Sequence, residues 1–173
     1  SDSGLLDEWF NDKRDFATAD AITLAPGEKR TGVDAGLAKG ATINGRVSVP
    51  SGVTIADWTI RVSAVSAGRD WGKSAYVSSD GTYRLSGLDA GDYRLQFDAD
   101  STTGLLDEWY NNATGFDSAR VVTVAAGAAR AGVNVTLARG ASISGRLSVP
   151  SGSSPTDVTV QVSDATQETV GYA

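Results

Sequence analysis

Apolar and polar residues alternate with a period of two along most of the chain. Within residues 41–49, Ile43 and Val47 are apolar, and the residues beside them are mostly polar. Trp58 is in phase with Ile60 of the next such segment, so we expect the Trp58 side chain in the core. The same alternation recurs at 74–77, 83–85, 93–97, 122–124 and 133–137. Because successive strand residues point to opposite faces of a sheet, this pattern predicts about seven short strands per hundred residues, a density typical of a β-sandwich.

Turn residues separate these segments. Asp80-Gly81 predicts a tight hairpin turn between two of them. Residues 89–93 read D-x-G-x-Y, the pattern of a tyrosine corner, in which the hydroxyl of Tyr93 bonds to an upstream turn. We therefore expect an all-β fold, a seven-stranded antiparallel Greek-key sandwich of the transthyretin-like or immunoglobulin-like kind.

The sequence repeats itself with an offset of 100 residues. GLLDEWF at 4–10 returns as GLLDEWY at 104–110, and KGATINGRVSVPSG at 39–52 returns as RGASISGRLSVPSG at 139–152. About half of the positions in the first sixty residues are identical to those one hundred residues later. This agreement indicates a true duplication rather than shared composition.

The phase of the repeat predicts how the chain is organised. Residues 40–139 form one complete sandwich unit by this reading. Residues 1–39 correspond to the C-terminal part of a preceding unit, and residues 140–173 to the N-terminal part of a following one. We interpret the chain as an excerpt from a tandem array that starts and stops inside units.

The string SDGTYRLSGLDAGDYRLQF at 79–97 resembles the hallmark of carboxypeptidase-regulatory-like and Cna-protein B-type repeats. The following segment, from DEWYNNA to GASISGRL, resembles the version common in multi-repeat exported proteins of actinobacteria. The resemblance implies a transthyretin-like sandwich in a secreted or cell-surface protein. Modules of this kind serve as stalks, spacers and adhesins, so the resemblance indicates the fold more sharply than the function.

Composition excludes several classes of function. The chain has no His and no Cys, so the usual zinc ligands, thiol catalysis and a Ser-His-Asp triad are unavailable. Its formal net charge is −6, which disfavours binding to a nucleic-acid backbone. Because no run of about 18 apolar residues occurs, we expect no membrane insertion. We expect no enzyme activity.

The most distinctive polar and aromatic motif is Trp109, Tyr110, Asn111 and Asn112. Exposed aromatic rings beside amides suit sugars, which stack on a ring face and form hydrogen bonds at their edges. Trp71, in a segment where the two copies differ, is a further candidate for glycan binding. The alternative, which we favour, is that the aromatic residues close one end of the sandwich and the asparagines form a turn.

Asp98, Asp100 and Asp107 are candidate oxygen ligands for Ca²⁺. The chain shows no D-x-D-x-D-G spacing, and the corresponding N-terminal residues read Ser1-Asp2-Ser3. We therefore prefer to interpret these aspartates as a solvated acidic loop, with no other cofactor expected.

A linker of about three residues, Ala138 to Gly140, joins the complete unit to the next, which is too short for a flexible tether. We therefore expect a semi-rigid rod, a structural stalk or filament of a secreted or cell-surface protein. The partial units expose apolar faces, so we expect them to pair with neighbouring repeats or identical chains, by strand complementation. The alternatives are a carbohydrate-binding or adhesive module that takes glycans, and an accessory domain of a secreted hydrolase.

Overall fold

The computed structural model describes residues 3–68, 71–150, 152, 156, 158–163 and 169–172. The chain divides into two compact units, 1–140 and 141–173, which we describe separately. Helical structure in the described ranges is limited to 3₁₀ turns, among them η1 (Phe16–Thr18), η2 (Ser101–Thr103) and η3 (Phe116–Ser118). The all-β sandwich expected from the alternation is confirmed.

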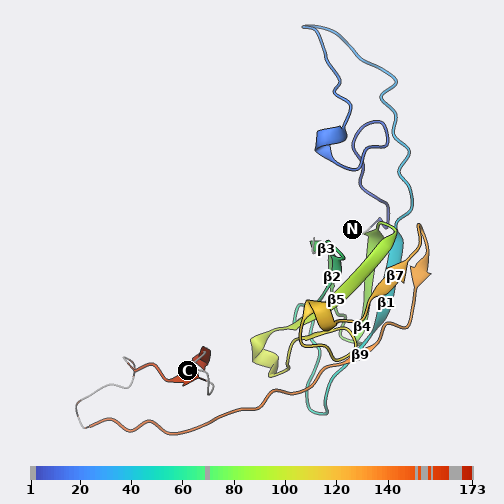
Figure 1. Ribbon diagram of the computed structural model, residues 1–173. Coiled ribbons are helices and arrows are strands. Elements are labelled where there is room, and N and C mark those ends of the chain that lie inside the picture. The colour runs from blue at the N-terminus through green and yellow to red at the C-terminus, as the bar shows by residue number, and fades with distance from the viewer. Residues whose placement is uncertain are drawn as a thin grey trace. The chain divides into compact units, whose positions relative to one another are not determined.

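The strands of the first unit form two sheets (Figure 1). The first sheet contains β1 (Ala41–Ser48), β4 (Thr82–Leu88), β8 (Ala129–Arg130) and β9 (Val135–Thr136). The second sheet contains β2 (Ile60–Ser66), β3 (Trp71–Tyr76), β5 (Gly91–Ala99), β6 (Glu108–Trp109) and β7 (Val122–Val124). β5 is the central strand of the second sheet, because it pairs with β2, β6 and β7.

One edge departs from the antiparallel order that we expected. β1 pairs antiparallel with β4 on one side, but on the other side it pairs in parallel with β8 and β9. The chain leaves the second sheet after β7 and crosses to the first sheet within residues 125–128, so β8 runs in the same direction as β1. A crossing between sheets of this kind is a Greek-key connection. The two parallel pairs are short and do not change the sandwich class.

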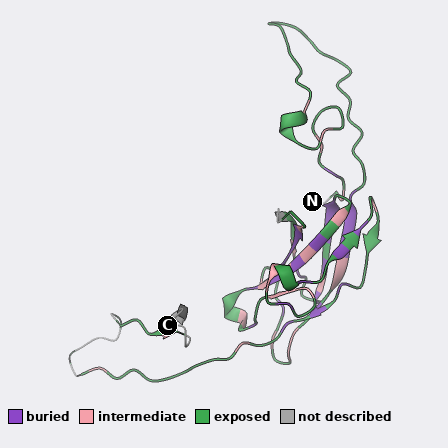
Figure 2. Ribbon diagram, in the orientation of Figure 1, coloured by how far each residue is buried: buried purple, intermediate pink, exposed green. Residues whose placement is uncertain are grey.

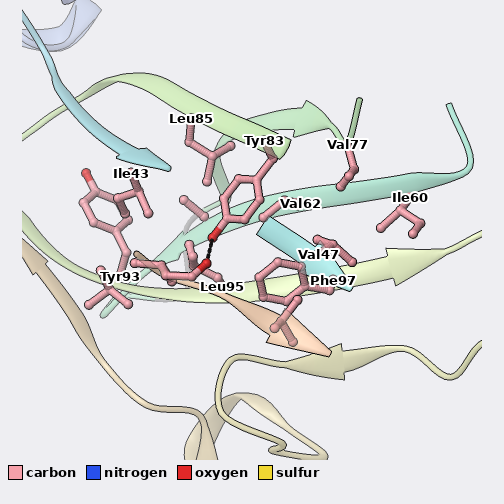
Figure 3. Packing of buried hydrophobic residues seen from close by; sticks show 14 of the residues in the cluster. Ile43, Val47, Ile60, Val62, Val77, Tyr83, Leu85, Tyr93, Leu95 and Phe97 are labelled. Atoms are coloured by element: carbon pink, nitrogen blue, oxygen red, sulfur yellow. Dashed lines mark hydrogen bonds between the residues drawn. The ribbon is translucent and has the colours of Figure 1, made fainter. Parts of the chain in front are cut away.

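The core of the first unit lies between its two sheets, where buried residues gather in Figure 2. The largest fully buried side chains include Phe97, Ile43, Ile60, Leu85 and Leu95. A buried polar group ties two segments of the first sheet together, because the Tyr83 hydroxyl of β4 donates to the carbonyl oxygen of Val133, just before β9, at 2.7 Å (Figure 3). Burial raises the pKa of Tyr83, so the phenol stays protonated as the donor of this bond.

The tyrosine corner fixes one end of the sandwich. The Tyr93 hydroxyl donates to the carbonyl oxygen of Asp89 at 3.0 Å, which confirms the corner predicted from the sequence. Because Ala41 pairs with Leu88, the start of β1 lies at this same end, where β4 passes into β5. β5 then runs for nine residues to the opposite end, where η2 follows it.

Residues 3–38 form the arm, a segment that joins the sandwich at the start of β1 (Figure 1). The arm has the local structure seen one hundred residues later. η1 corresponds to η3, and pairs of isolated bridges match between the two stretches. The matching bridges are Leu5 with Lys39, Trp9 with Lys13, Leu105 with Arg139, and Trp109 with Ala113.

The second unit contains one hairpin, formed by β10 (Gln161–Ser163) and β11 (Thr169–Tyr172). Its register corresponds to that of β2 and β3 in the first unit. Gln161 pairs with Tyr172, as Arg61 pairs with Tyr76. These partners are 172 − 161 = 11 and 76 − 61 = 15 positions apart, so the second hairpin is four residues shorter. Tyr172 therefore corresponds to Tyr76.

Candidate functional site

A tight hairpin contains the four predicted residues Trp109, Tyr110, Asn111 and Asn112. The N–H of Trp109 donates to the carbonyl oxygen of Ala113 at 2.9 Å, and the N–H of Ala113 donates back at 3.0 Å. Asn111 and Asn112 form the turn with φ of 72° and 57°, a region that asparagine adopts more readily than most residues. Both asparagines are exposed.

The aromatic side chains of this hairpin pack against other parts of the protein. The ring of Trp109 meets the ring of Phe116 edge to face, with centroids 5.5 Å apart. Tyr110 packs against the core, and its N–H donates to the carbonyl oxygen of Leu95 at 2.8 Å. The Arg94 guanidinium lies 4.6 Å from the centroid of the Phe116 ring. These contacts favour the structural interpretation, in which the hairpin closes one edge of the second sheet.

Glu108 precedes this hairpin and is half-buried. Its Oε1 atom is buried without a hydrogen-bond partner. Burial raises the pKa of Glu108, and a hydrogen bond from the backbone of Asn112 opposes this shift. The side chain of the neighbouring Asp107 binds the backbone of β5 instead, because its Oδ1 accepts a hydrogen bond from the N–H of Ala99 at 2.8 Å. The carboxylates of Asp107 and Glu108 therefore do not form an acid–base pair. The alternation of apolar and polar residues does not predict the burial of Glu108.

The three aspartates predicted as calcium ligands have separate local partners. Asp98 forms an ion pair with Arg61 at 2.9 Å. Asp100 accepts the N–H of Thr102 at 2.9 Å at the start of η2, and hydrogen bonds from Thr102 hold the pKa of Asp100 below its usual range. Asp107 is held by the β5 backbone, as described above. Among the residues that the structure describes, no three acidic side chains gather as metal ligands.

Trp58 is exposed, so the expectation that it belongs to the core was wrong. Its side chain is 74% exposed and lies in the turn before β2, where its φ is 74°. Alternation with Ile60 would bury Trp58 only if the strand included it, but β2 begins at Ile60. The Trp58 ring instead packs edge to face against Tyr76, with centroids 4.8 Å apart.

An open cavity of about 340 Å³ lies beside this exposed pair of rings. Its lining combines Trp58 and Tyr76 with the charged side chains Arg61, Asp98 and Asp100. An exposed aromatic ring beside hydrogen-bonding groups is the combination that the sequence predicts at Trp109 for glycan binding. The side chain of Trp71, the other aromatic candidate, lies outside the part of the chain that the structure describes.

The arm exposes apolar side chains at positions that are buried in the complete sandwich. The four exposed positions are Ile22 at 39%, Leu24 at 56%, Val33 at 44% and Leu37 at 49%. Their counterparts one hundred residues later are Val122 at 3%, Val124 at 4%, Val133 at 1% and Leu137 at 0%. The arm therefore has the pattern of core-facing strands without the sheet that would cover them.

The second unit also exposes apolar side chains whose counterparts at the start of the complete sandwich are buried. Its exposed positions are Ile143 at 83%, Leu147 at 49% and Val160 at 46%. Their counterparts are Ile43 at 0%, Val47 at 2% and Ile60 at 1%. Within the second unit, Ile143, Leu147 and Val160 line an open groove of about 320 Å³.

No helix in the described ranges is long and apolar enough to cross a bilayer. The family model of the carboxypeptidase regulatory-like domain matches residues 42–138, which is 97 of the 173 residues and covers most of the complete sandwich. No curated protein matches the chain.

Proposed function

The chain belongs to the carboxypeptidase regulatory-like domain family, and on this basis we propose that it is a structural repeat of a stalk or filament in a secreted or cell-surface protein. The family is a β-sandwich module that often occurs in extracellular proteins. In the proposed array, consecutive sandwiches follow one another with short connections, and the role of each unit is to supply length and stiffness.

The observation that supports the array is the matched burial of equivalent positions. Residues that are core in the complete sandwich have apolar counterparts in the arm and in the second unit, but these counterparts are exposed. Several large apolar side chains exposed within one segment are unfavourable in water. The occupant that fits them is the complementary part of the same sandwich, because the complete unit already shows which strands cover each position.

The pairing partners can be assigned from the complete unit. β1 pairs with β8 and β9, with Thr42 opposite Ala129 and Val47 opposite Val135. Segment 141–148 of one copy therefore fits alongside residues 29–36 of a neighbouring unit or identical chain. Neither segment provides the equivalent of β5, the central strand of the second sheet. For this reason we propose that the remaining strands of the same repeat, supplied within the array, complete each sandwich, and that pairing of identical chains is the weaker association.

The test extends the protein to complete its second sandwich. Because Tyr172 corresponds to Tyr76, adding residues 78–139 after residue 173 supplies the strands that the second unit lacks. We call this protein the completed chain. Ile143→Asp should unfold its second sandwich, since a buried carboxylate without a partner is strongly destabilising. The matched control is Ser148→Asp, whose counterpart Ser48 is exposed, and it should leave the sandwich folded.

Two measurements decide the outcome. Far-UV circular dichroism and urea unfolding should show a second cooperative β unit in the completed chain, which Ile143→Asp removes. Sedimentation velocity of the 173-residue chain over increasing concentration tests the weaker association between identical chains. A completed chain in which Ile143, Leu147 and Val160 stay as exposed as before, with Ile143→Asp and Ser148→Asp indistinguishable, would contradict the array.

A second function, carbohydrate binding, is favoured by the cavity beside Trp58 and Tyr76. Sugar rings stack on exposed aromatic faces, and Arg61 and Asp98 would supply hydrogen bonds at the ring edge. Titration with a panel of oligosaccharides, followed by tryptophan fluorescence, tests this function. Binding should disappear in Trp58→Ala and persist in Trp109→Ala. The opposite result would show that the sugar binds at the hairpin of residues 109–112 instead.

A further inference from the structure

Two adjacent leucines exchange their burial between the arm and the complete sandwich. In the sandwich, Leu105 is 8% exposed and belongs to the core, whereas Leu106 is 53% exposed. In the arm the order is reversed, because Leu5 is 38% exposed and Leu6 is 8% exposed. Neighbouring residues of an extended segment point to opposite sides. In the sandwich the first leucine of the pair therefore faces the core and the second faces outward, whereas in the arm the second leucine is the covered one.

The contacts of Leu6 show what covers the second leucine. Leu6 packs against Gly40 at the tyrosine-corner end of the sandwich that follows it, where the backbones of Gly40 and Gly87 lie close together. A Cβ atom on Gly40 would lie 2.5 Å from the Gly87 Cα atom and 3.0 Å from Leu6 Cδ2, so the close approach requires glycine at position 40. Gly87 has a φ of 67°, and a Cβ atom there would lie 3.0 Å from the carbonyl oxygen of Leu5. We call Gly40 and Gly87, with the space that Leu6 fills, the leucine seat.

Backbone hydrogen bonds hold the chain at the seat. The N–H of Gly40 donates to the carbonyl oxygen of Gly4 at 2.9 Å, and the N–H of Leu6 donates to that of Ala38 at 2.9 Å. The same pair of bonds recurs at the other end of the sandwich. There the N–H of Gly140 donates to Gly104 and the N–H of Leu106 donates to Ala138, both at 2.9 Å.

Ion pairs add to the joint at the arm but do not recur. Asp7 contacts Lys73 at 2.9 Å, and Arg14 contacts Asp89 at 3.5 Å. All four side chains are largely exposed, so these pairs contribute little compared with the burial of Leu6. At the corresponding position after the sandwich, Thr114 replaces Arg14, so the ion pair of Arg14 has no equivalent there. The feature that both joints share is the leucine beside a glycine.

From these contacts we infer that Leu106 is a docking surface for the next sandwich of the array. Its occupant is the tyrosine-corner end of that sandwich, with Gly140 and the counterpart of Gly87 forming the leucine seat. One half of this seat is already in place, because a Cβ on Gly140 would lie 3.2 Å from Leu106 Cδ2. This inference rests on the proposed array and adds that consecutive units contact one another directly through a fixed joint.

The two leucines provide a matched test in the 173-residue chain. Leu6→Ala should empty an occupied seat, so the Gly40 N–H should exchange with solvent about tenfold faster or more. Leu106→Ala removes a side chain that is already exposed, so exchange at the Gly140 N–H should change by less than about twofold. Amide hydrogen exchange measured by NMR gives both values, and circular dichroism confirms that the sandwich is folded. Equal effects of the two substitutions would overturn the inference.

The completed chain supplies the missing half of the second seat. In that protein Leu106→Ala should accelerate exchange at the Gly140 N–H about tenfold or more, as Leu6→Ala does at Gly40. If the second sandwich folds and Leu106→Ala still has no effect, the docking surface is wrong while the array stands. If the second sandwich does not fold at all, the array and the docking surface both fail.

Discussion

Gly45→Ala tests the packing of the sandwich at its closest backbone approach. A Cβ atom at Gly45 would lie 1.9 Å from the carbonyl oxygen of Val133. Since real Cβ contacts are almost never shorter than 3.0 Å, β1 and the segment before β9 would have to separate by at least 3.0 − 1.9 = 1.1 Å. That separation disturbs the bond from the Tyr83 hydroxyl to Val133 and the bond from the Val133 N–H to Asn44.

The magnitude follows from these two bonds. Each hydrogen bond contributes about 1 kcal/mol, and leaving the buried Tyr83 hydroxyl without a partner costs a further 1–3 kcal/mol or so. We therefore expect Gly45→Ala to lower the free energy of unfolding by about 3–5 kcal/mol, a large part of the stability of a typical domain. Urea unfolding followed by circular dichroism measures this change.

Gly145→Ala is the matched control, because a Cβ atom at Gly145 would have no neighbour within 4 Å. It should change the free energy of unfolding by less than about 0.5 kcal/mol. In the completed chain, Gly145 acquires the surroundings of Gly45, and the same substitution should then become destabilising. A Gly45→Ala protein that unfolds within about 1 kcal/mol of the original would refute the packing argument.

Three further predictions follow from individual side chains. Because burial raises the pKa of Glu108, the ionised carboxylate destabilises the fold. Glu108→Gln should therefore raise the urea midpoint at pH 7, and this gain should vanish below pH 4.5, where Glu108 is protonated. Hydrogen bonds from Thr82 lower the pKa of Asp80, so ionised Asp80 stabilises the fold at any pH above its ordinary pKa of 3.8. This contribution is lost as the pH falls through the lowered pKa. Asp80→Asn should therefore lower the urea midpoint at pH 7 but not at pH 2. Trp58→Ala should leave the free energy of unfolding within about 0.5 kcal/mol, whereas Phe97→Ala should lower it by about 3–5 kcal/mol, because Trp58 is mostly exposed and Phe97 is fully buried.

The alternation predicted most of the sandwich because its strands have one buried face. Ile43 and Val47 of β1, and Leu95 and Phe97 of β5, are buried as their phase requires. The tyrosine corner was predictable because its bond from Tyr93 joins residues only four positions apart. Local patterns of this kind can be read from the sequence alone.

Contacts between distant segments were harder to predict. The phase of Trp58 indicated the core, but the left-handed backbone of the turn before β2 directs its side chain to the surface. The burial of Leu6 in place of Leu5 depends on its contact with the sandwich that follows, and alternation does not contain that information. Asp98 and Asp100 line the same cavity, but the pairing of Asp98 with Arg61 of β2 joins residues 37 positions apart and could not be predicted from alternation.

The rise per repeat tests the stalk most directly. The complete unit is spanned by β5, whose nine residues extend about 30 Å at about 3.3 Å per residue. Small-angle X-ray scattering on chains lengthened by one, two and three hundred-residue units should therefore show the maximum dimension growing by a constant increment of about 30–40 Å per unit. Increments that shrink with each added unit, as in a compact globule or a flexibly tethered string, would contradict the account.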